Sequence, residues 1–293
     1  MEWVFFTLLA VFLWSICSII DKYVLKKYIK DPMIIMTFFA IFQLIFAFVV
    51  FVFQPVTIPP LNTLLFSLAS GIAYFIFIFL YIKSLLVEEV SRVISLYAIT
   101  PIFVLILSTI FLHEIFSLEK YAGIFMIVIG SILISLKKKT NFKLSRALFF
   151  MVIAAIFGAI YYILQKFVLN SLTYWNVFFW VRIGSFLLAP FILFAYYKPF
   201  IKTFRKNTIA GVYLSIVEIL NAIGVYLIVI AYSIGYAALV NAFTEVQSLV
   251  VLLMATALSI FNPKIIKEEL KGSTVLMKFV AIIMIIAGAI LIS

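Results

Sequence analysis

The chain has 293 residues, of which 67% are hydrophobic and only 11% are charged, and its mean hydropathy is +1.30. Soluble globular domains carry about 25% charged residues, so this composition excludes that class of protein. The net charge of +11 lies mostly in short segments between apolar stretches, which excludes a nucleic-acid-binding surface as its explanation. Cys17 is the only cysteine, so neither an intramolecular disulfide nor a cysteine-based metal site can form.

Ten apolar segments follow one another, each long enough to cross a hydrocarbon core of about 30 Å. We therefore predict an all-α polytopic membrane protein with ten transmembrane helices, and we expect it to hold no metal and no cofactor. A proline suits the first helical turn but interrupts a helix interior. Asp31-Pro32 is thus predicted to begin the second span, Lys198-Pro199 to end the seventh and Asn262-Pro263 to end the ninth, while Pro101 is predicted to kink the fourth. The predicted spans are 3–20, 33–53, 61–82, 92–112, 119–136, 146–165, 174–197, 208–230, 237–261 and 273–292.

The lysine and arginine residues between these spans fall in every second gap. The odd-numbered gaps hold eighteen of them, and the even-numbered gaps hold only Lys120 and Lys166. Because short loops rich in lysine and arginine stay in the cytoplasm, the odd gaps are predicted to be cytoplasmic. This pattern predicts a multi-pass protein of the plasma membrane with both chain termini on the outer side.

The chain also repeats internally. Residues 126–135 and 284–293 share seven of ten positions, and Lys22-Tyr-Val-Leu matches Lys166-Phe-Val-Leu. We predict two five-helix repeats, residues 1–136 and 146–293, joined by a cytoplasmic linker at 137–145. An odd number of helices gives the second repeat the opposite orientation in the membrane. Inverted repeats of this kind are common in secondary transporters, whose binding site lies near the midplane between the halves.

Three charged residues are predicted to lie at membrane depth in the second half. They are Arg182, Glu218 and Glu245. Inserting a charged side chain at the bilayer centre costs about 2.5–3.5 kcal/mol on insertion scales, so such residues usually have a functional role. Asn221 shares a helix face with Glu218, and Asn241 shares one with Glu245. These five residues are candidates for substrate binding or coupling, with at least one acid expected to carry a proton during transport. The alternatives are an interhelical lock at Glu218, a polar seam at Glu245, and an ion pair between Arg182 and either acid.

The first half offers fewer polar candidates. Gln43 is at the centre of the second span, and Trp14 and Tyr81 are in the first and third. Aromatic side chains at helical spacing also serve as packing, which is the alternative for the latter two. If they line a cavity, amphipathic or aromatic solutes would suit it.

A set of short motifs gives the chain a family resemblance. The fourth span begins with Ser91-Arg92-Val93, contains Pro101 and is followed by Leu112-His113-Glu114, while the ninth begins with Ala237-Ala238-Leu239-Val240. In this order the motifs resemble the EamA-type members of the drug/metabolite transporter superfamily. The chain departs from the family pattern at His113, where glycine is usual, and at Gln247, near the place of a missing proline. The resemblance implies ten helices around a central cavity and export or exchange of metabolites such as amino acids, nucleotides and sugars.

The function expected from these observations is secondary active transport. We predict an exporter or exchanger of a small metabolite, such as an amino acid or a related amphipathic solute, working by alternating access around a central cavity. The chain lacks the G-x-x-x-x-G-K-[ST] motif, so ATP is not expected to drive it directly. A passive channel or facilitator and a non-transporting membrane protein remain alternatives. An intramembrane enzyme is not expected, because neither His113 nor Cys17 has an evident catalytic partner.

The expected partners follow from the predicted transport function. They are a small-molecule substrate, a coupling proton or ion, and the lipid bilayer, with no nucleic acid. The protein is expected to work as a monomer or a homodimer.

Overall fold

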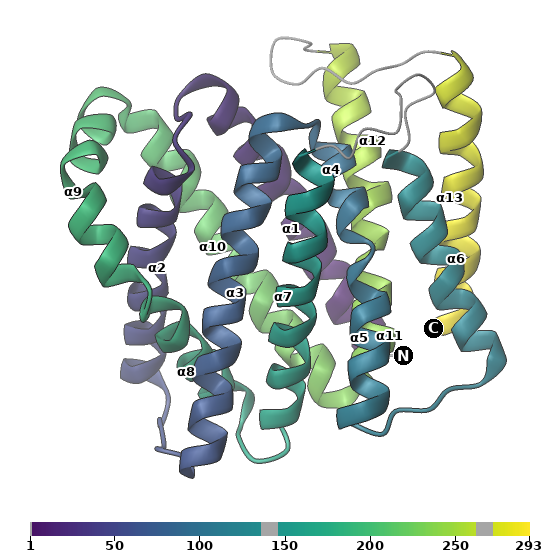
Figure 1. Ribbon diagram of the computed structural model, residues 1–293, viewed down its shortest axis with the longest axis horizontal. Helices are drawn as coiled ribbons and strands as arrows, with labels where there is room; N and C mark the ends of the chain where they lie inside the picture. Colours follow the sequence, from purple (N-terminus) through teal and green to yellow (C-terminus); the bar gives the residue numbers. More distant parts are fainter. Residues whose placement is uncertain (1, 136–145, 262–271) are drawn as a thin grey trace.

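The computed structural model describes residues 2–135, 146–261 and 272–293, apart from the side chains of 135 and 272–276. The predicted linker at 137–145 and Asn262-Pro263 lie outside the described residues. Within them the fold is entirely helical (Figure 1). The helices are α1 (Glu2–Lys27), α2 (Pro32–Phe53), α3 (Leu61–Val87), α4 (Val90–Tyr97), α5 (Thr100–Phe111), α6 (Leu118–Ser135), α7 (Arg146–Val168), α8 (Tyr174–Phe186), α9 (Ala189–Lys206), α10 (Thr208–Ile234), α11 (Ala237–Thr244), α12 (Val246–Phe261) and α13 (Gly272–Ile292).

Length and hydropathy identify fewer membrane spans than the ten predicted. Among the described residues, seven helices or helix pairs are long and apolar enough to cross a bilayer. Counting the pair α8 and α9, which bends by 58°, gives up to eight. In α13, only the shorter apolar stretch Met277–Ile292 is recognised. The chain is therefore an all-helical, multi-pass membrane protein.

Breaks divide three of the predicted spans: the fourth, the ninth, and the seventh, which is divided between α8 and α9. The fourth is interrupted at Ala98 and Ile99, so that Pro101 lies in the first turn of α5, where its missing N–H removes no helical hydrogen bond. The ninth is interrupted at Glu245, between α11 and α12. The predicted end of the seventh span at Lys198-Pro199 is wrong, because α9 continues through Pro199 to Lys206. A proline costs a helix about one hydrogen bond, and the remaining turns of α9 keep theirs.

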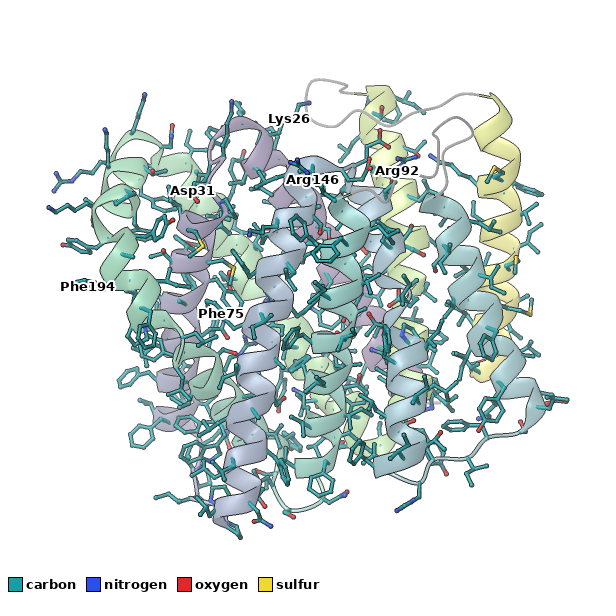
Figure 2. The ribbon with its side chains drawn as sticks, in the orientation of Figure 1. Lys26, Asp31, Phe75, Arg92, Arg146 and Phe194 are labelled. Atoms are coloured by element: carbon teal, nitrogen blue, oxygen red, sulfur yellow. The ribbon has the colours of Figure 1, made fainter. Side chains whose placement is uncertain are left out.

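Helices from the first and second halves of the chain pack against each other in pairs. Helix α1 lies along α10, α3 lies along α7, and α6 lies along α13. Figure 2 shows Lys26, near the end of α1, at the same end of the molecule as Arg146, which begins α7. The first helices of the two halves therefore run in opposite directions. Arg92 lies at this end too, so basic residues far apart in the sequence gather there.

Lys22 and Lys166 make matching hydrogen bonds to the last carbonyls of two helices. The Lys22 ammonium donates to the carbonyls of Leu85 and Glu88, both at 2.6 Å, where α3 ends. The Lys166 ammonium donates to the carbonyls of Tyr232 and, at 2.9 Å, Gly235, where α10 ends. Lys166 lies 144 positions after Lys22, and its two acceptors each lie 147 positions after those of Lys22. The same helix cap is thus built twice, from the short motif that the sequence repeats.

Candidate functional site

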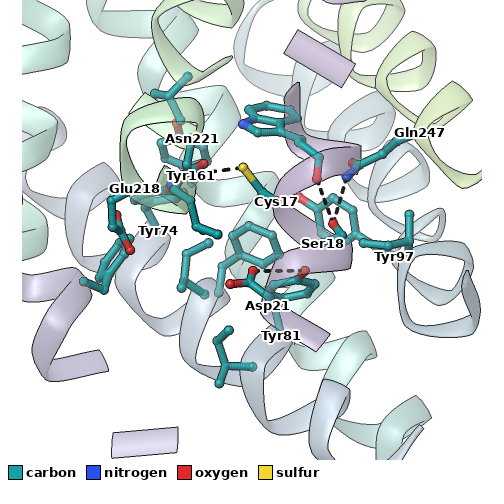
Figure 3. Close-up of a pocket in the computed structure, with 18 of the residues that line it drawn as sticks. Cys17, Ser18, Asp21, Tyr74, Tyr81, Tyr97, Tyr161, Glu218, Asn221 and Gln247 are labelled. Carbon is teal, nitrogen blue, oxygen red and sulfur yellow. Dashed lines mark hydrogen bonds between the residues drawn. The ribbon is translucent and has the colours of Figure 1, made fainter. Parts of the chain in front are cut away.

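A cavity of about 90 Å³ lies where α1, α3, α7 and α10 meet, and it is shown in Figure 3. It has room for several water molecules or one small solute. Helices of both halves enclose it, because α2, α4, α11 and α12 contribute side chains as well. The lining residues are Trp14, Cys17, Ser18, Asp21, Ile35, Phe39, Tyr74, Phe77, Ile78, Tyr81, Ile82, Ile94, Tyr97, Tyr161, Tyr162, Val217, Glu218, Asn221, Val225, Thr244 and Gln247.

Aromatic rings form much of the cavity wall. Tyr74 and Tyr161 stack with ring centroids 4.7 Å apart, and Phe77 stacks on Tyr97 at 4.8 Å. These two pairs join α3 to α7 and to α4, so the wall depends on contacts between segments far apart in the sequence. Stacked rings have fewer rotamers than aliphatic chains of similar size, which keeps the shape of the wall defined.

Two carboxylates line the cavity, one from each half of the chain. Asp21 on α1 is 6% exposed, and Glu218 on α10 is 5% exposed. The Tyr81 hydroxyl donates to Oδ2 of Asp21 at 3.5 Å, a long hydrogen bond. Oε2 of Glu218 has no hydrogen-bond partner. In the described part of the chain, the cavity is lined by no lysine or arginine.

Uncharged polar groups complete the lining. The Asn221 amide donates to the Tyr74 hydroxyl at 2.9 Å, and the Gln247 amide donates to the Ser18 hydroxyl at 3.3 Å. Each bond joins the two halves across the cavity. The Cys17 thiol lies 3.5 Å from the carbonyl of Val217, which holds α1 against α10. The helices around the cavity are therefore joined partly by polar contacts that side-chain rotation can break.

Arg182 lies outside this lining, on α8. It is 1% exposed, its Nη1 donates to Oε1 of Gln43, and its guanidinium carbon lies 4.5 Å from the centre of the Phe178 ring. The ion pair with Glu218 or Glu245, left open by the sequence, does not form, since no such pair lies within 4.0 Å among the described residues. The amide and the aromatic faces take the place of a carboxylate around this cation.

Asn241 and Glu245 are also outside the cavity lining. Asn241 is fully buried on α11, and Glu245 is the residue at which α11 ends. Neither the Asn241 amide nor Oε1 of Glu245 has a hydrogen-bond partner within the described ranges. Thr244 and Gln247, on either side of Glu245, do line the cavity, so this break in the ninth span borders the site.

The structure thus divides the eight predicted site residues into three groups. Trp14, Tyr81, Glu218 and Asn221 line one cavity; Gln43 and Arg182 form a buried pair; and Asn241 and Glu245 lie at the break in the ninth span. Among the residues described, no group of three His, Cys, Asp or Glu side chains is arranged to hold a metal ion.

Sequence reasoning missed Asp21 because the first span was predicted to end at residue 20, before a run of lysines. Helix α1 instead continues to Lys27, so Asp21 belongs to its interior. A signal was present: Trp14, Cys17, Ser18 and Asp21 recur at intervals of three and four residues, which places them on one helix face. All four line the cavity.

Comparisons with known proteins agree with this fold. Residues 1–136 match the EamA-like transporter family. In the comparison with curated proteins, no sequence matches the chain. Among solved structures, 28 chains match. One crystal structure, 12% identical in sequence, superimposes with a TM-score of 0.69 over 99% of this chain and 96% of its own length, which shows a shared fold. The family resemblance inferred from the sequence is confirmed by this match over residues 1–136, which is consistent with an EamA-type membrane transporter.

Proposed function

We propose that this chain is a secondary active transporter that moves a small metabolite across the plasma membrane, as an exporter or exchanger. The observation that carries the proposal is the cavity lined by both halves of the chain, with a buried carboxylate from each. Secondary transporters place their sites near the membrane midplane between repeated halves. Ionisable groups at that depth usually belong to substrate or proton pathways.

The proposed architecture is ten spans arranged as two inverted five-helix repeats. In this arrangement α4 with α5, α8 with α9, and α11 with α12 are divided spans, and α6 and α13 are the fifth helix of each half. The exchanged packing of α1 with α10 and of α3 with α7 supports it, as do the paired caps at Lys22 and Lys166. The gathering of Lys26, Arg92 and Arg146 at one end supports outer positions for both termini.

Alternating access requires elements that can move against this framework. The breaks between α4 and α5 and between α11 and α12 border the cavity through Tyr97 and Thr244. Residues at helix breaks can absorb the backbone changes of an opening motion. We propose that these breaks are the hinges and that a buried acid carries the coupling proton. The protein is proposed to do this as a monomer or as a homodimer.

The native cysteine tests this mechanism without knowledge of the substrate. Cys17 lines the cavity and is buried, so a membrane-impermeant thiol reagent should reach it only when the cavity opens. In vesicles of known orientation, alternating access predicts labelling from either side, with no solute leak through the protein. Cys17→Ser gives the background. Labelling from one side alone, or labelling with an unsaturable solute leak, would contradict the proposal.

A further inference from the structure

We propose that the solute held in this cavity is a small organic cation, an ammonium ion placed between Asp21 and Glu218. This assignment rests on the transport function proposed above and adds a substrate class to it. Its starting point is the charge of the lining, which contains two acids from opposite halves and, in the described residues, no basic side chain.

Two cations, Lys22 and Arg182, lie near the cavity but are not among the residues that line it. Lys22 follows Asp21 in the sequence, yet its ammonium donates to the carbonyls at the end of α3. Arg182 donates through Nη1 to Gln43 and lies against the Phe178 ring, while its Nε and Nη2 have no hydrogen-bond partner among the described residues. Arg182 attracts Glu218 electrostatically but forms no ion pair with it. The lining itself therefore offers the two acids no cation, and a cationic solute would supply one in direct contact.

The hydrogen-bonding capacity of the two acids is largely unused. Glu218 lines the cavity, and its Oε2 atom is buried and has no hydrogen-bond partner within the described residues. The bond that Asp21 accepts from Tyr81, at 3.5 Å, is long. A carboxylate has about four acceptor positions, so both side chains can receive N–H donors from a bound solute. An unpartnered buried acceptor costs free energy, which such a solute would recover.

The walls between the acids suit the same class of ligand. Trp14, Tyr74, Phe77 and Tyr81 line the cavity, and aromatic faces attract ammonium ions through their negative quadrupole. The rings also exclude water, which strengthens the attraction between a cation and the acids. Figure 3 shows Asp21 and Glu218 approaching the cavity from different helices, with Tyr74 and Tyr81 near them.

The same lining disfavours a solute that carries a carboxylate or a phosphate. No lysine or arginine among the described lining residues would receive that group. The Asn221 amide already donates to Tyr74. An amino acid, the example expected from the sequence, would therefore bring an unpaired negative charge, whereas an amine without the carboxylate would not.

Matched solutes separate charge from shape. Choline, its neutral carbon isostere 3,3-dimethylbutan-1-ol and its carboxylate-bearing analogue glycine betaine differ mainly in charge. Tetramethylammonium, guanidinium and phenethylamine extend the cationic set, with 2-phenylethanol as the neutral partner of phenethylamine and phenylalanine as its zwitterion. Binding would be measured with the whole chain in detergent, from the rise of the thermal unfolding temperature with solute concentration.

The proposal expects at least one cation to bind tenfold or more tightly than its neutral isostere and its zwitterion. Glu218→Gln and Asp21→Asn should each weaken that cation tenfold or more while changing the affinity of the neutral isostere less than twofold. Glu119→Gln, at an exposed site on α6, removes one negative charge as a control and should leave the binding unchanged. Circular dichroism would establish that each variant is folded.

Two outcomes would overturn the assignment. One is that no cation is preferred over its neutral and zwitterionic partners. The other is that the preference survives both carboxylate substitutions. If either occurs while Cys17 is labelled from both sides of the membrane, the cation assignment alone fails and the transport proposal stands. If labelling also fails, the transport proposal falls with it.

Discussion

The two halves of the chain, which we propose are inverted repeats of one framework, place different side chains around the cavity. Asp21 on α1 has Gln165 as its counterpart on α7, 144 positions later, and Glu218 on α10 has Gly71 on α3, 147 positions earlier. Gln165 is buried outside the cavity lining, where its amide donates to the Tyr161 hydroxyl at 3.3 Å. On the proposed repeat, the two halves share the arrangement of their helices. The acids of the cavity lie at positions where the two halves have different residues.

The contrast between Gly71 and Glu218 has a packing cause. A Cβ atom at Gly71 would collide with backbone atoms of Val181, Gly184 and Ser185 on α8, so α3 and α8 are in close contact there. The Ser185 hydroxyl also donates to the carbonyl of Gly71 at 2.9 Å. At the equivalent position of α10, the helix leaves space, and Glu218 occupies the border of the cavity. One half packs at this position, and the other places an acid there that we propose binds the solute.

The largest loss of stability should come from disrupting the close contact of Gly71 with α8. Gly71→Val places a branched side chain against the α8 backbone, and we expect the free energy of unfolding to fall by about 3 kcal/mol. Thermal unfolding, followed by a thiol-reactive fluorophore on the buried Cys17, would measure the loss. Gly211→Ala is the control, since its Cβ would meet only the Phe204 ring, at 3.3 Å. Equal stability of the two variants would contradict a tight contact between α3 and α8.

Removal of a repeated helix cap should have the next largest effect. Lys166→Met leaves the carbonyls of Tyr232 and Gly235 without their donor, and we expect a loss of about 2 kcal/mol in the free energy of unfolding. Lys22→Met should cost a similar amount at the end of α3. Lys166→Arg keeps donors at the site and serves as the control. The same unfolding assay applies, and a loss confined to one of the two lysines would show that the caps are not equivalent.

Moving a carboxylate from position 21 to position 165 tests whether cation binding depends on where the acid lies. Asp21→Asn should weaken cation binding about tenfold, which corresponds to about 1.4 kcal/mol. Adding Gln165→Glu returns a carboxylate to the equivalent helix position, yet binding should not recover because Gln165 is not among the residues that line the cavity. Titration of the preferred cation against the single and double variants would measure this. Recovery in the double variant would mean that charge near the cavity, and not its position, determines affinity.

The smallest effect is expected where equivalent residues of the two halves meet. Tyr74 and Asn221 are 147 positions apart, and they bond to each other. Tyr74→Phe removes this hydrogen bond but keeps the stack on Tyr161, so we expect a loss of about 0.5–1 kcal/mol. Tyr121→Phe, on a partly exposed ring of α6 that packs edge-on against Phe116, is the control. A loss above about 3 kcal/mol would show that the hydroxyl supports more of the interface than one bond.

Much of the candidate site could be predicted from residue type and helical spacing. Glu218 was identified from the cost of a charge at membrane depth, and Asn221 from its place one turn later. Asp21 was missed because a helix end was assigned from nearby lysines, although a helix can extend beyond the hydrocarbon and carry them on its last turns. Arg182 is predicted to bind substrate or to pair with an acid; the structure shows no such ion pair among the described residues, and Arg182 instead donates to Gln43, 139 residues away.

The sequence by itself determined the class of protein and the approximate positions of the described helices, because hydrophobic length, prolines and loop charges act locally along the chain. Only the tertiary structure decided which polar residues share the cavity. That choice depends on how each helix is rotated and on which helix of the other half lies against it. Glu114 shows the same limit: its carboxylate accepts hydrogen bonds from the Ala237 and Ala238 amides at the start of α11, at 2.7 and 3.1 Å. Such partners are brought together by packing between distant segments, and local sequence does not encode them.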